Sequence, residues 1–243
     1  MADRATGEGV KLGDPTTLEW HFFVPCRDEQ AVIGATVTYL RQTFRAAHVW
    51  VVDDDSDDRT ATVVRNLRRI DGRNIHLVQR YRPQARTGKG DALNAGYRAL
   101  KAWQGRHATP ERAIVIVLDA GGRPMWNCLG VTAAHFEERW TGSVQIDVRT
   151  SNAGRGWFEW LTNARRIDTS RLSGNGQFIR LSALDSIAGP EGEPWRGERL
   201  SAAWQASHTR DTYVYQRALP VPQANDRTVR VRRVIAPVPA FDH

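Results

Sequence analysis

The chain has 243 residues, 41% of them hydrophobic, and a formal net charge of +7. This length suffices to bury the core of one large domain or two small ones, so a globular enzyme or binding protein is expected. No apolar run approaches the ~18 residues of a membrane span, and the N-terminal stretch MADRATGEGVKLGDP lacks the apolar core of a secretory signal. These features predict a cytoplasmic protein without a transmembrane segment.

Cysteine usage and the distribution of basic residues narrow the class further. Cys26 and Cys128 can pair only once and lack a metal-ligand spacing, so buried free thiols are expected. Most arginines are scattered, and only RTVRVRR at 227–233 is dense, which a basic tail, solvated or facing a membrane, explains. No nucleic-acid partner is expected.

Short apolar runs alternate with helical patterns along the first half of the chain. In chain order, the expected strands are LEWHFFVP (18–25), HVWVVD (48–53), NIHLVQR (74–80) and the buried central run AIVIVLD (113–119). Between them, apolar spacing predicts three helices, with inward faces Ile33, Val37, Leu40 and Phe44; Val63, Leu67 and Ile70; and Leu93, Tyr97 and Leu100. Ser56 is the expected N-cap of the second helix, with Asp57 and Asp58 in its first turn.

Three strand–helix repeats followed by a buried strand predict an α/β fold with a largely parallel sheet and right-handed crossovers. In such sheets, ligands bind at the carboxyl ends of the strands. These ends carry acids: Asp28 and Glu29 after the first strand, Asp53–Asp55 after the second and Asp119 after the fourth. Because like charges gathered on one rim repel each other, a cation, hydrogen-bond donors of a ligand or water must compensate them.

Four motifs carry a family resemblance. VPCRDE, VVDDDSDD, GKGDALNAG and VLDA, in this order, resemble the nucleotide-sugar-binding half of the family 2 glycosyltransferases, inverting enzymes that include cellulose, chitin and hyaluronan synthases. SGNGQFIRLSAL (173–184) resembles the segment near their acceptor side. The resemblance spans residues 19 to 184 and implies a GT-A-like, Rossmann-related fold with a mixed, mostly parallel sheet flanked by helices.

The expected domain organisation follows the same resemblance. Residues 1–18 form an N-terminal extension, and residues 19–220 form a single GT-A-like domain. Its nucleotide-sugar-binding half covers 19–123 and its acceptor half covers 124–220. Residues 221–243 form a basic, proline-containing tail.

The resemblance also implies a donor site for a nucleotide-diphosphate sugar, most simply a UDP-sugar. Pro25 and Glu29 then lie near the base, and Asp53 or Asp54 accepts the imide N–H of uracil or binds the ribose. Lys89 supplies positive charge beside the diphosphate. The remaining expected site residues are Asp91 and Asn94, toward the sugar or the strand ends, and Gly174, Asn175, Gly176, Gln177 and Arg180 on the acceptor side. The acceptor itself is not identified.

Two departures from the family pattern concern catalysis. The family's Asp-x-Asp, which holds Mg or Mn against the diphosphate, has here only Asp119, because Gly121 replaces the second acid. Asp119 with waters and phosphate oxygens still offers a weakened site for Mg or Mn. The Thr-Glu-Asp triplet that supplies the base is absent, and Glu193 and Glu198 are the nearest carboxylates.

A third departure is the absence of the Gln-x-x-Arg-Trp pattern of processive synthases. Two hypotheses therefore stand. The chain is a non-processive inverting glycosyltransferase of hexosyltransferase type, or it is a pseudoenzyme that keeps the donor pocket and serves as a nucleotide-sugar-binding or partner module.

Overall fold

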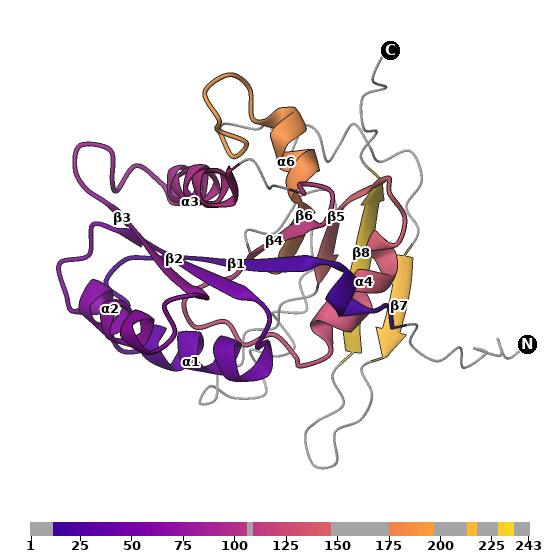
Figure 1. Cartoon of the computed structure of the whole chain (residues 1–243), viewed down its shortest axis with the longest axis horizontal. Coiled ribbons are helices and arrows are strands. Elements are labelled where there is room, and N and C mark those ends of the chain that lie inside the picture. The colour runs from indigo at the N-terminus through magenta and orange to yellow at the C-terminus, as the bar shows by residue number, and fades with distance from the viewer. Residues whose placement is uncertain (1–11, 106–108, 147–174, 197–212, 218–227, 236–243) are drawn as a thin grey trace, which may run out of the picture.

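The computed structural model describes residues 12–105, 109–146, 175–196, 213–217 and 228–235. A single sheet runs through the described part of the chain, with helices on both of its faces (Figure 1). In chain order, its elements are η1 (Pro15–Thr17), β1 (Glu19–Cys26), α1 (Ile33–Thr43), β2 (His48–Asp54), α2 (Thr60–Ile70), β3 (Ile75–Arg80), α3 (Lys89–Gln104), β4 (Ala113–Val117), α4 (Cys128–Phe136), β5 (Thr141–Ile146), β6 (Gln177–Arg180), α6 (Leu181–Ile187), β7 (Tyr213–Arg217) and β8 (Thr228–Ile235).

The sheet is mixed, and its strand order is β3-β2-β1-β4-β6-β5-β8-β7. The first four strands in this order pair in parallel, whereas β6 is antiparallel to both β4 and β5, and β8 is antiparallel to both β5 and β7. All strands except β6 and β8 therefore point the same way. This confirms the expected mixed, mostly parallel sheet and places the carboxyl ends of β1, β2, β3 and β4 on one edge.

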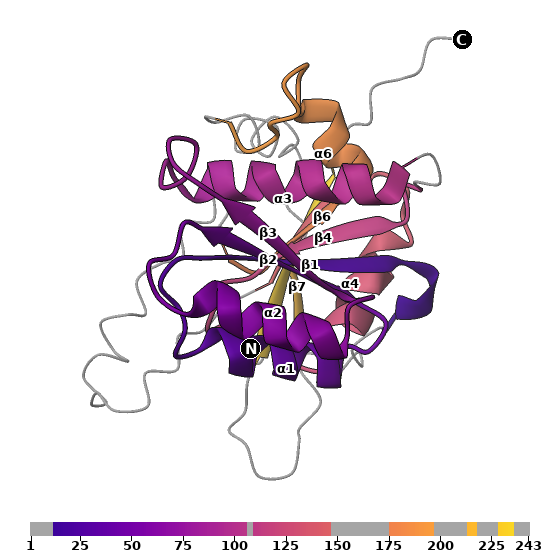
Figure 2. The ribbon, with the colours of Figure 1, turned by 60° about the vertical axis from the view of Figure 1, so that its left-hand side comes forward.

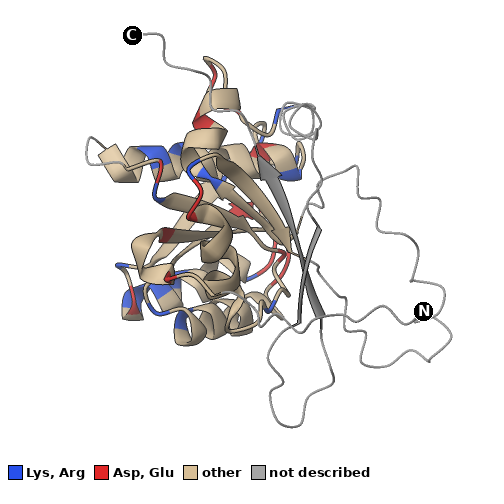
Figure 3. Ribbon diagram, turned by 90° about the vertical axis from the view of Figure 1, so that its right-hand side faces the viewer, with Lys and Arg blue, Asp and Glu red and all other residues tan. Residues whose placement is uncertain are grey.

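Two hydrophobic cores fill the space between the sheet and its helices. On one face, α1, α2 and α4 pack their apolar side chains against β1 and β2, around the fully buried Phe22, Ile33 and Leu40. On the other, α3 and α6 cover Phe23 and Ile179 with side chains such as Leu100 and Leu184. Figure 2 shows the sheet between these helical layers. Figure 3 shows charged residues mainly on helices and loops, as expected when alternate strand residues feed two apolar cores.

The predicted strands and helices are confirmed, except that Ile70, expected on the inner face of the second helix, is 85% exposed at the end of α2. Two further corrections concern a helix cap and the C-terminal tail. Ser56 does not cap α2, which begins at Thr60 after Arg59 and has no acid in its first turn. The reason is that Ser56 and Asp58 make other contacts: the Ser56 hydroxyl donates to Asp53 Oδ1, and Asp58 Oδ1 accepts from the Thr60 backbone N–H at 2.8 Å.

The second correction concerns the expected tail at 221–243. Thr228–Ile235 is strand β8, which pairs with β5 and β7 and so belongs to the sheet. The physical reason lies in the sequence TVRVRRVI, in which valine and arginine alternate over residues 229–232 at the two-residue period of a strand.

Candidate functional site

The carboxyl ends of β1 and β2 are locked together by hydrogen bonds between their loops. The Asp28 backbone N–H donates to Ser56 Oγ (3.0 Å), and the Asp57 N–H donates back to Asp28 Oδ1 (2.8 Å). The Glu29 N–H donates to Thr60 Oγ1 at 2.9 Å. Pro25 and Glu29 therefore sit beside the acids that follow β2, on the edge of the sheet where ligands bind in α/β folds.

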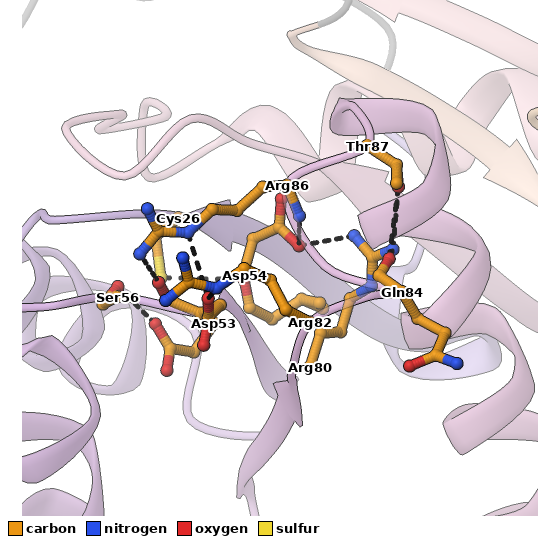
Figure 4. Close-up of polar contacts among 11 residues, drawn as sticks. Cys26, Asp53, Asp54, Ser56, Arg80, Arg82, Gln84, Arg86 and Thr87 are labelled. Atoms are coloured by element: carbon orange, nitrogen blue, oxygen red, sulfur yellow. Dashed lines mark hydrogen bonds and ion pairs between the residues drawn. The ribbon is translucent and has the colours of Figure 1, made fainter.

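Arginines of the chain itself neutralise much of the acidic rim after β2 (Figure 4). Asp54 and Arg80, both nearly buried, form an ion pair of 2.5 Å, and the Arg86 backbone N–H donates to the same carboxylate at 3.1 Å. Asp55 binds both Arg82 (2.9 Å) and Arg86 (3.0 Å). Arginines of the segment 80–86 thus neutralise most of the negative charge of the acids after β2, a role that the sequence left open between a cation, a ligand and water.

Asp53 differs from its neighbours in this cluster. Its side chain is buried and accepts a hydrogen bond from Ser56 Oγ, and in the sheet Asp53 lies opposite Cys26. Burial, followed by the nearby Asp53 carboxylate, raises the pKa of the Cys26 thiol. Cys26 and Cys128 are both free and buried, as predicted.

Lys89 and Asp119 form the second charged group on the same edge. Lys89 Nζ lies 2.5 Å from Asp119 Oδ1, which joins the start of α3 to the end of β4. The N-cap of α3 is Gly88, and no side chain caps this helix. The backbone N–H groups of its first turn, which begins at Lys89, therefore have no side-chain acceptor from the N-cap residue. A helix N-terminus beside an ammonium group is an arrangement that favours an anionic ligand.

The loop after β4 is held in place by α1. Thr36 Oγ1 donates to the Ala120 carbonyl, and Tyr39 donates to the Pro124 carbonyl at 2.6 Å. These bonds fix the backbone on both sides of Gly121. The Asp119 carboxylate itself stays accessible, with 53% of its side chain exposed.

Part of the expected acceptor side meets this loop. Asn175 Oδ1 accepts from the Asp119 N–H at 3.2 Å, and the Gly176 N–H donates to the Val117 carbonyl at 2.8 Å. Gln177 is buried opposite Val117 in the β4–β6 pair. Gly174 lies outside the described residues.

Arg180 does not join this group. It lies opposite Ile114, at the amino end of β4, because β6 runs antiparallel to β4. Its guanidinium donates to the carbonyls of Thr141 (3.1 Å) and Phe136 (2.8 Å). Arg180 is therefore placed among backbone carbonyls away from the rim.

The start of α3 is also packed against the segment that precedes the expected base. Asn94, with 1% exposure, accepts from the Trp195 backbone N–H at 2.9 Å, and a Cβ on Gly90 would lie 3.0 Å from the Trp195 carbonyl oxygen. Asn94 Nδ2 and Trp195 Nε1 are buried without a hydrogen-bond partner in the described part of the chain. Asp91 lies in the first turn of α3.

Of the two candidate bases, Glu193 and Glu198, the structure describes only Glu193. Glu193 is engaged by two guanidinium groups, those of Arg98 (3.3 Å) and Arg196 (3.4 Å), and its own backbone N–H donates to the Ala188 carbonyl. Glu198 lies outside the described residues.

The residues present fit a divalent ion held by one carboxylate. Among the described residues, no group of three or more His, Cys, Asp or Glu side chains forms a metal cage. Mg²⁺ commonly keeps several waters and takes one or two carboxylates plus substrate phosphates, which an exposed Asp119 allows. A Cβ on Gly121 would meet no heavy atom within 4 Å, so this position has room for a second carboxylate.

In the donor site that the family resemblance implies, Gly121→Asp is expected to lower the Mn²⁺-dependent Kd for UDP on the order of tenfold, because charge count tunes the affinity of oxygen-ligand sites. Calorimetric titration of UDP with and without Mn²⁺ measures this change. Gly121→Asn, which has the same shape and no charge, is the matched control. An equal gain in the Asn variant, or a gain that does not depend on Mn²⁺, would contradict the assignment.

The fold and site define an α/β domain that gathers acids, a lysine and an open helix N-terminus at the carboxyl edge of a parallel sheet. The chain belongs to glycosyl transferase family 2, whose sequence profile matches residues 22–192. No helix in the described part of the chain has the length and apolar character to cross a membrane.

Sequence relatives include β-monoglucosyldiacylglycerol synthases of cyanobacteria. The protein of Trichormus variabilis is 28% identical over 194 residues, and that of Synechocystis sp. is 30% identical over 196 residues. Each alignment covers 73% of this chain and 38% of the relative. The chain thus spans well under half the length of these relatives.

Solved structures share the GT-A fold. The Pyrobaculum calidifontis mannosyltransferase PcManGT, in complex with GDP-Man and Mn²⁺, superposes with a TM-score of 0.55 at 21% identity, covering 83% of this chain and 56% of the other. S. aureus TarS 1-349, in complex with UDP, gives 0.52 at 20% identity, covering 77% and 55%.

Sequence reasoning missed Arg80, Arg82 and Arg86, and it did not foresee the contact of Trp195 with Asn94. The arginine spacing in RYRPQAR, immediately before TGKG, was the available signal for the first three. Trp195 had no such signal, because its contact with Asn94 joins residues 101 positions apart.

Proposed function

We propose that this chain is the catalytic domain of a glycosyltransferase that takes the hexose of a UDP-sugar and transfers it with inversion. The observation that carries the proposal is the Lys89–Asp119 pair of 2.5 Å, beside the uncapped N-terminus of α3. In this proposal, Lys89 and the helix N-terminus bind the diphosphate, and Asp119 holds Mg²⁺ or Mn²⁺. The metal, when bound, neutralises charge on the leaving diphosphate.

The other expected site residues keep proposed roles around this centre. Asp53 and Asp54, beside Pro25 and Glu29, read the base or ribose. Asp91 is proposed to contact the sugar, and the buried Asn94 to hold the Trp195 backbone against the start of α3. Family membership and the names of the relatives favour a transferase over a pseudoenzyme.

The names of the relatives also support a lipid acceptor of the diacylglycerol type. A sugar hydroxyl or glycerol hydroxyl must lose a proton as the glycosidic bond forms, so a base is required. Glu193 is held by Arg98 and Arg196, which leaves Glu198 as the proposed base.

Release of UDP from a panel of UDP-sugars, with diacylglycerol in mixed micelles as acceptor, tests this function. Turnover is expected to need Mn²⁺ or Mg²⁺. Asp119→Asn is expected to lower kcat/KM about 100-fold or more, because a catalytic metal contributes several kcal/mol of transition-state stabilisation.

Asp14→Asn is the matched control, because Asp14 is an acid that only caps η1 through Thr16. It is expected to leave turnover unchanged. UDP binding without turnover on any sugar would support the binding-module alternative, and turnover by Asp119→Asn at the wild-type rate would refute the role of this carboxylate.

A further inference from the structure

One face of the sheet is covered by helices that contain no acidic residue. Helices α1, α2 and α4 lie on this face, and none of their sequences contains Asp or Glu (Figure 2). On the opposite face, α3 contains Asp91 and α6 contains Asp185. We call the first set the α1–α2–α4 layer.

Exposed arginines give this layer its charge. Five arginines on α2 or in the turns that follow α1 and α2 are exposed, and none pairs with a carboxylate among the described residues: Arg45, Arg65, Arg68, Arg69 and Arg73. Surfaces of soluble domains ordinarily intersperse the two signs. This surface instead carries only positive charge along the second half of α2, at Arg65, Arg68 and Arg69.

Two of the acids that flank α2 are already paired with other arginines. Asp71, directly after α2, binds Arg41 at 2.6 Å. Asp57, before α2, binds Arg86 at 2.6 Å, and this bond lowers the pKa of the Asp57 carboxyl. Neither acid is therefore available to compensate the exposed arginines of α2.

Two large apolar side chains are exposed in the same layer. Ile70 ends α2 next to Arg69 and is 85% exposed, and Trp126, just before α4, is 55% exposed. An exposed apolar residue alone is ordinary. Ile70 directly follows the exposed Arg68 and Arg69, and Trp126 lies elsewhere in the layer, before α4. Arginine together with an exposed aliphatic or Trp side chain fits the boundary between headgroups and acyl chains of a bilayer.

We propose that the α1–α2–α4 layer is a docking surface for a lipid bilayer that contains anionic phospholipids. Arginines near such a surface are each attracted by its negative potential, and Ile70 and Trp126 add apolar contact. A nucleic acid fits less well, because its phosphates would engage the arginines and leave the exposed Ile70 without an apolar partner. The proposal goes beyond the proposed function. Docking on a bilayer would bring the site close to a lipid acceptor, which resides in the membrane.

Co-sedimentation of the full chain with vesicles tests the proposal without sugar donor or acceptor, so its outcome does not depend on glycosyl transfer. We expect binding to phosphatidylcholine vesicles that contain phosphatidylglycerol, weak binding to phosphatidylcholine alone, and loss of binding at high salt. Each neutralised arginine should lower the partition coefficient about fivefold, so Arg68→Gln with Arg69→Gln should lower it about 25-fold.

The matched control is Arg98→Gln with Arg196→Gln. These arginines belong to α3 and to the segment after α6, and the control removes the same charge from the other face. It should bind as the wild type does. Equal losses in both double variants would show that net charge alone acts, and this would overturn the proposal. Equal binding to vesicles with and without phosphatidylglycerol would also overturn the proposal. Binding to a DNA duplex but not to vesicles would overturn it as well.

Discussion

Replacing Arg180 by methionine is expected to lower the free energy of unfolding by about 3 to 5 kcal/mol, because several backbone carbonyls lose a charged donor and each buried one costs about 1 to 3 kcal/mol. Arg180 is 6% exposed and donates to the carbonyls of Thr141, Phe136, Glu138 and Glu111. Its guanidinium also lies 5.1 Å from the centre of the Phe136 ring. Methionine fills similar space and leaves these carbonyls without their donor.

Urea denaturation of the two proteins measures this difference. Arg112→Met is the control, because Arg112 is exposed and donates one hydrogen bond, to the Thr17 carbonyl. It should cost less than about 1 kcal/mol. A similar small cost for Arg180→Met, accompanied by loss of acceptor binding, would return Arg180 to the acceptor side where the sequence placed it.

The second large effect is expected below neutral pH, at the amino ends of β1, β2 and β3. His21 is fully buried there, with Nε2 unpartnered among the described residues and Nδ1 accepting from Trp50 Nε1 at 3.3 Å. The rings of His48 and His76 lie close by, 3.2 Å apart between His48 Nδ1 and His76 Nε2. Burial, followed by the neighbouring histidines, lowers the pKa of His21 to about 3, and burial lowers that of His76 to about 4.

Stability should therefore be lost as the pH falls below about 6.5, the ordinary pKa of histidine. Above that pH, both the folded and the unfolded chain hold neutral imidazoles. Below it, His21 takes up a proton in the unfolded chain but stays neutral in the folded chain until the pH approaches its folded-state pKa of about 3. Protonation therefore favours the unfolded chain. One such group costs about 1.4 kcal/mol per pH unit, or about 3 kcal/mol between pH 6.5 and 4.5.

Urea denaturation across this pH range, on the wild type and on His21→Gln, isolates the histidine. Carboxylates titrate in both proteins, so the difference between their pH slopes belongs to the imidazole. Glutamine can still accept from Trp50 and does not titrate. Parallel slopes in the two proteins would show that the folded state accommodates a charged His21.

The sequence placed the elements of the first half well because their apolar residues recur at two regular periods. AIVIV forms a strand that is buried at every position. Leu93, Tyr97 and Leu100, spaced four and three residues apart, form the inner face of α3. The same patterns were weaker near helix ends. Ile70 continued the apolar spacing of α2 yet is 85% exposed, because the helix ends there, beyond the edge strand.

The candidate site was predictable to the level of the strand ends and no further. Since parallel strands share one carboxyl edge, Asp53, Lys89 and Asp119 had to come to the same rim, and they do. The family resemblance named the donor class. The match to residues 22–192 confirms the family, and the donor class stays a prediction.

The sequence by itself determined the positions of strands and helices and the acidic character of the rim, because both follow from local periodicity and chain direction. Only the tertiary structure decided which cation meets which acid, that Arg180 holds backbone carbonyls at the opposite end, and that Trp195 rests on Asn94. These pairings depend on strand register and on the reach of individual side chains. Residues far apart in sequence carry no local signal of either.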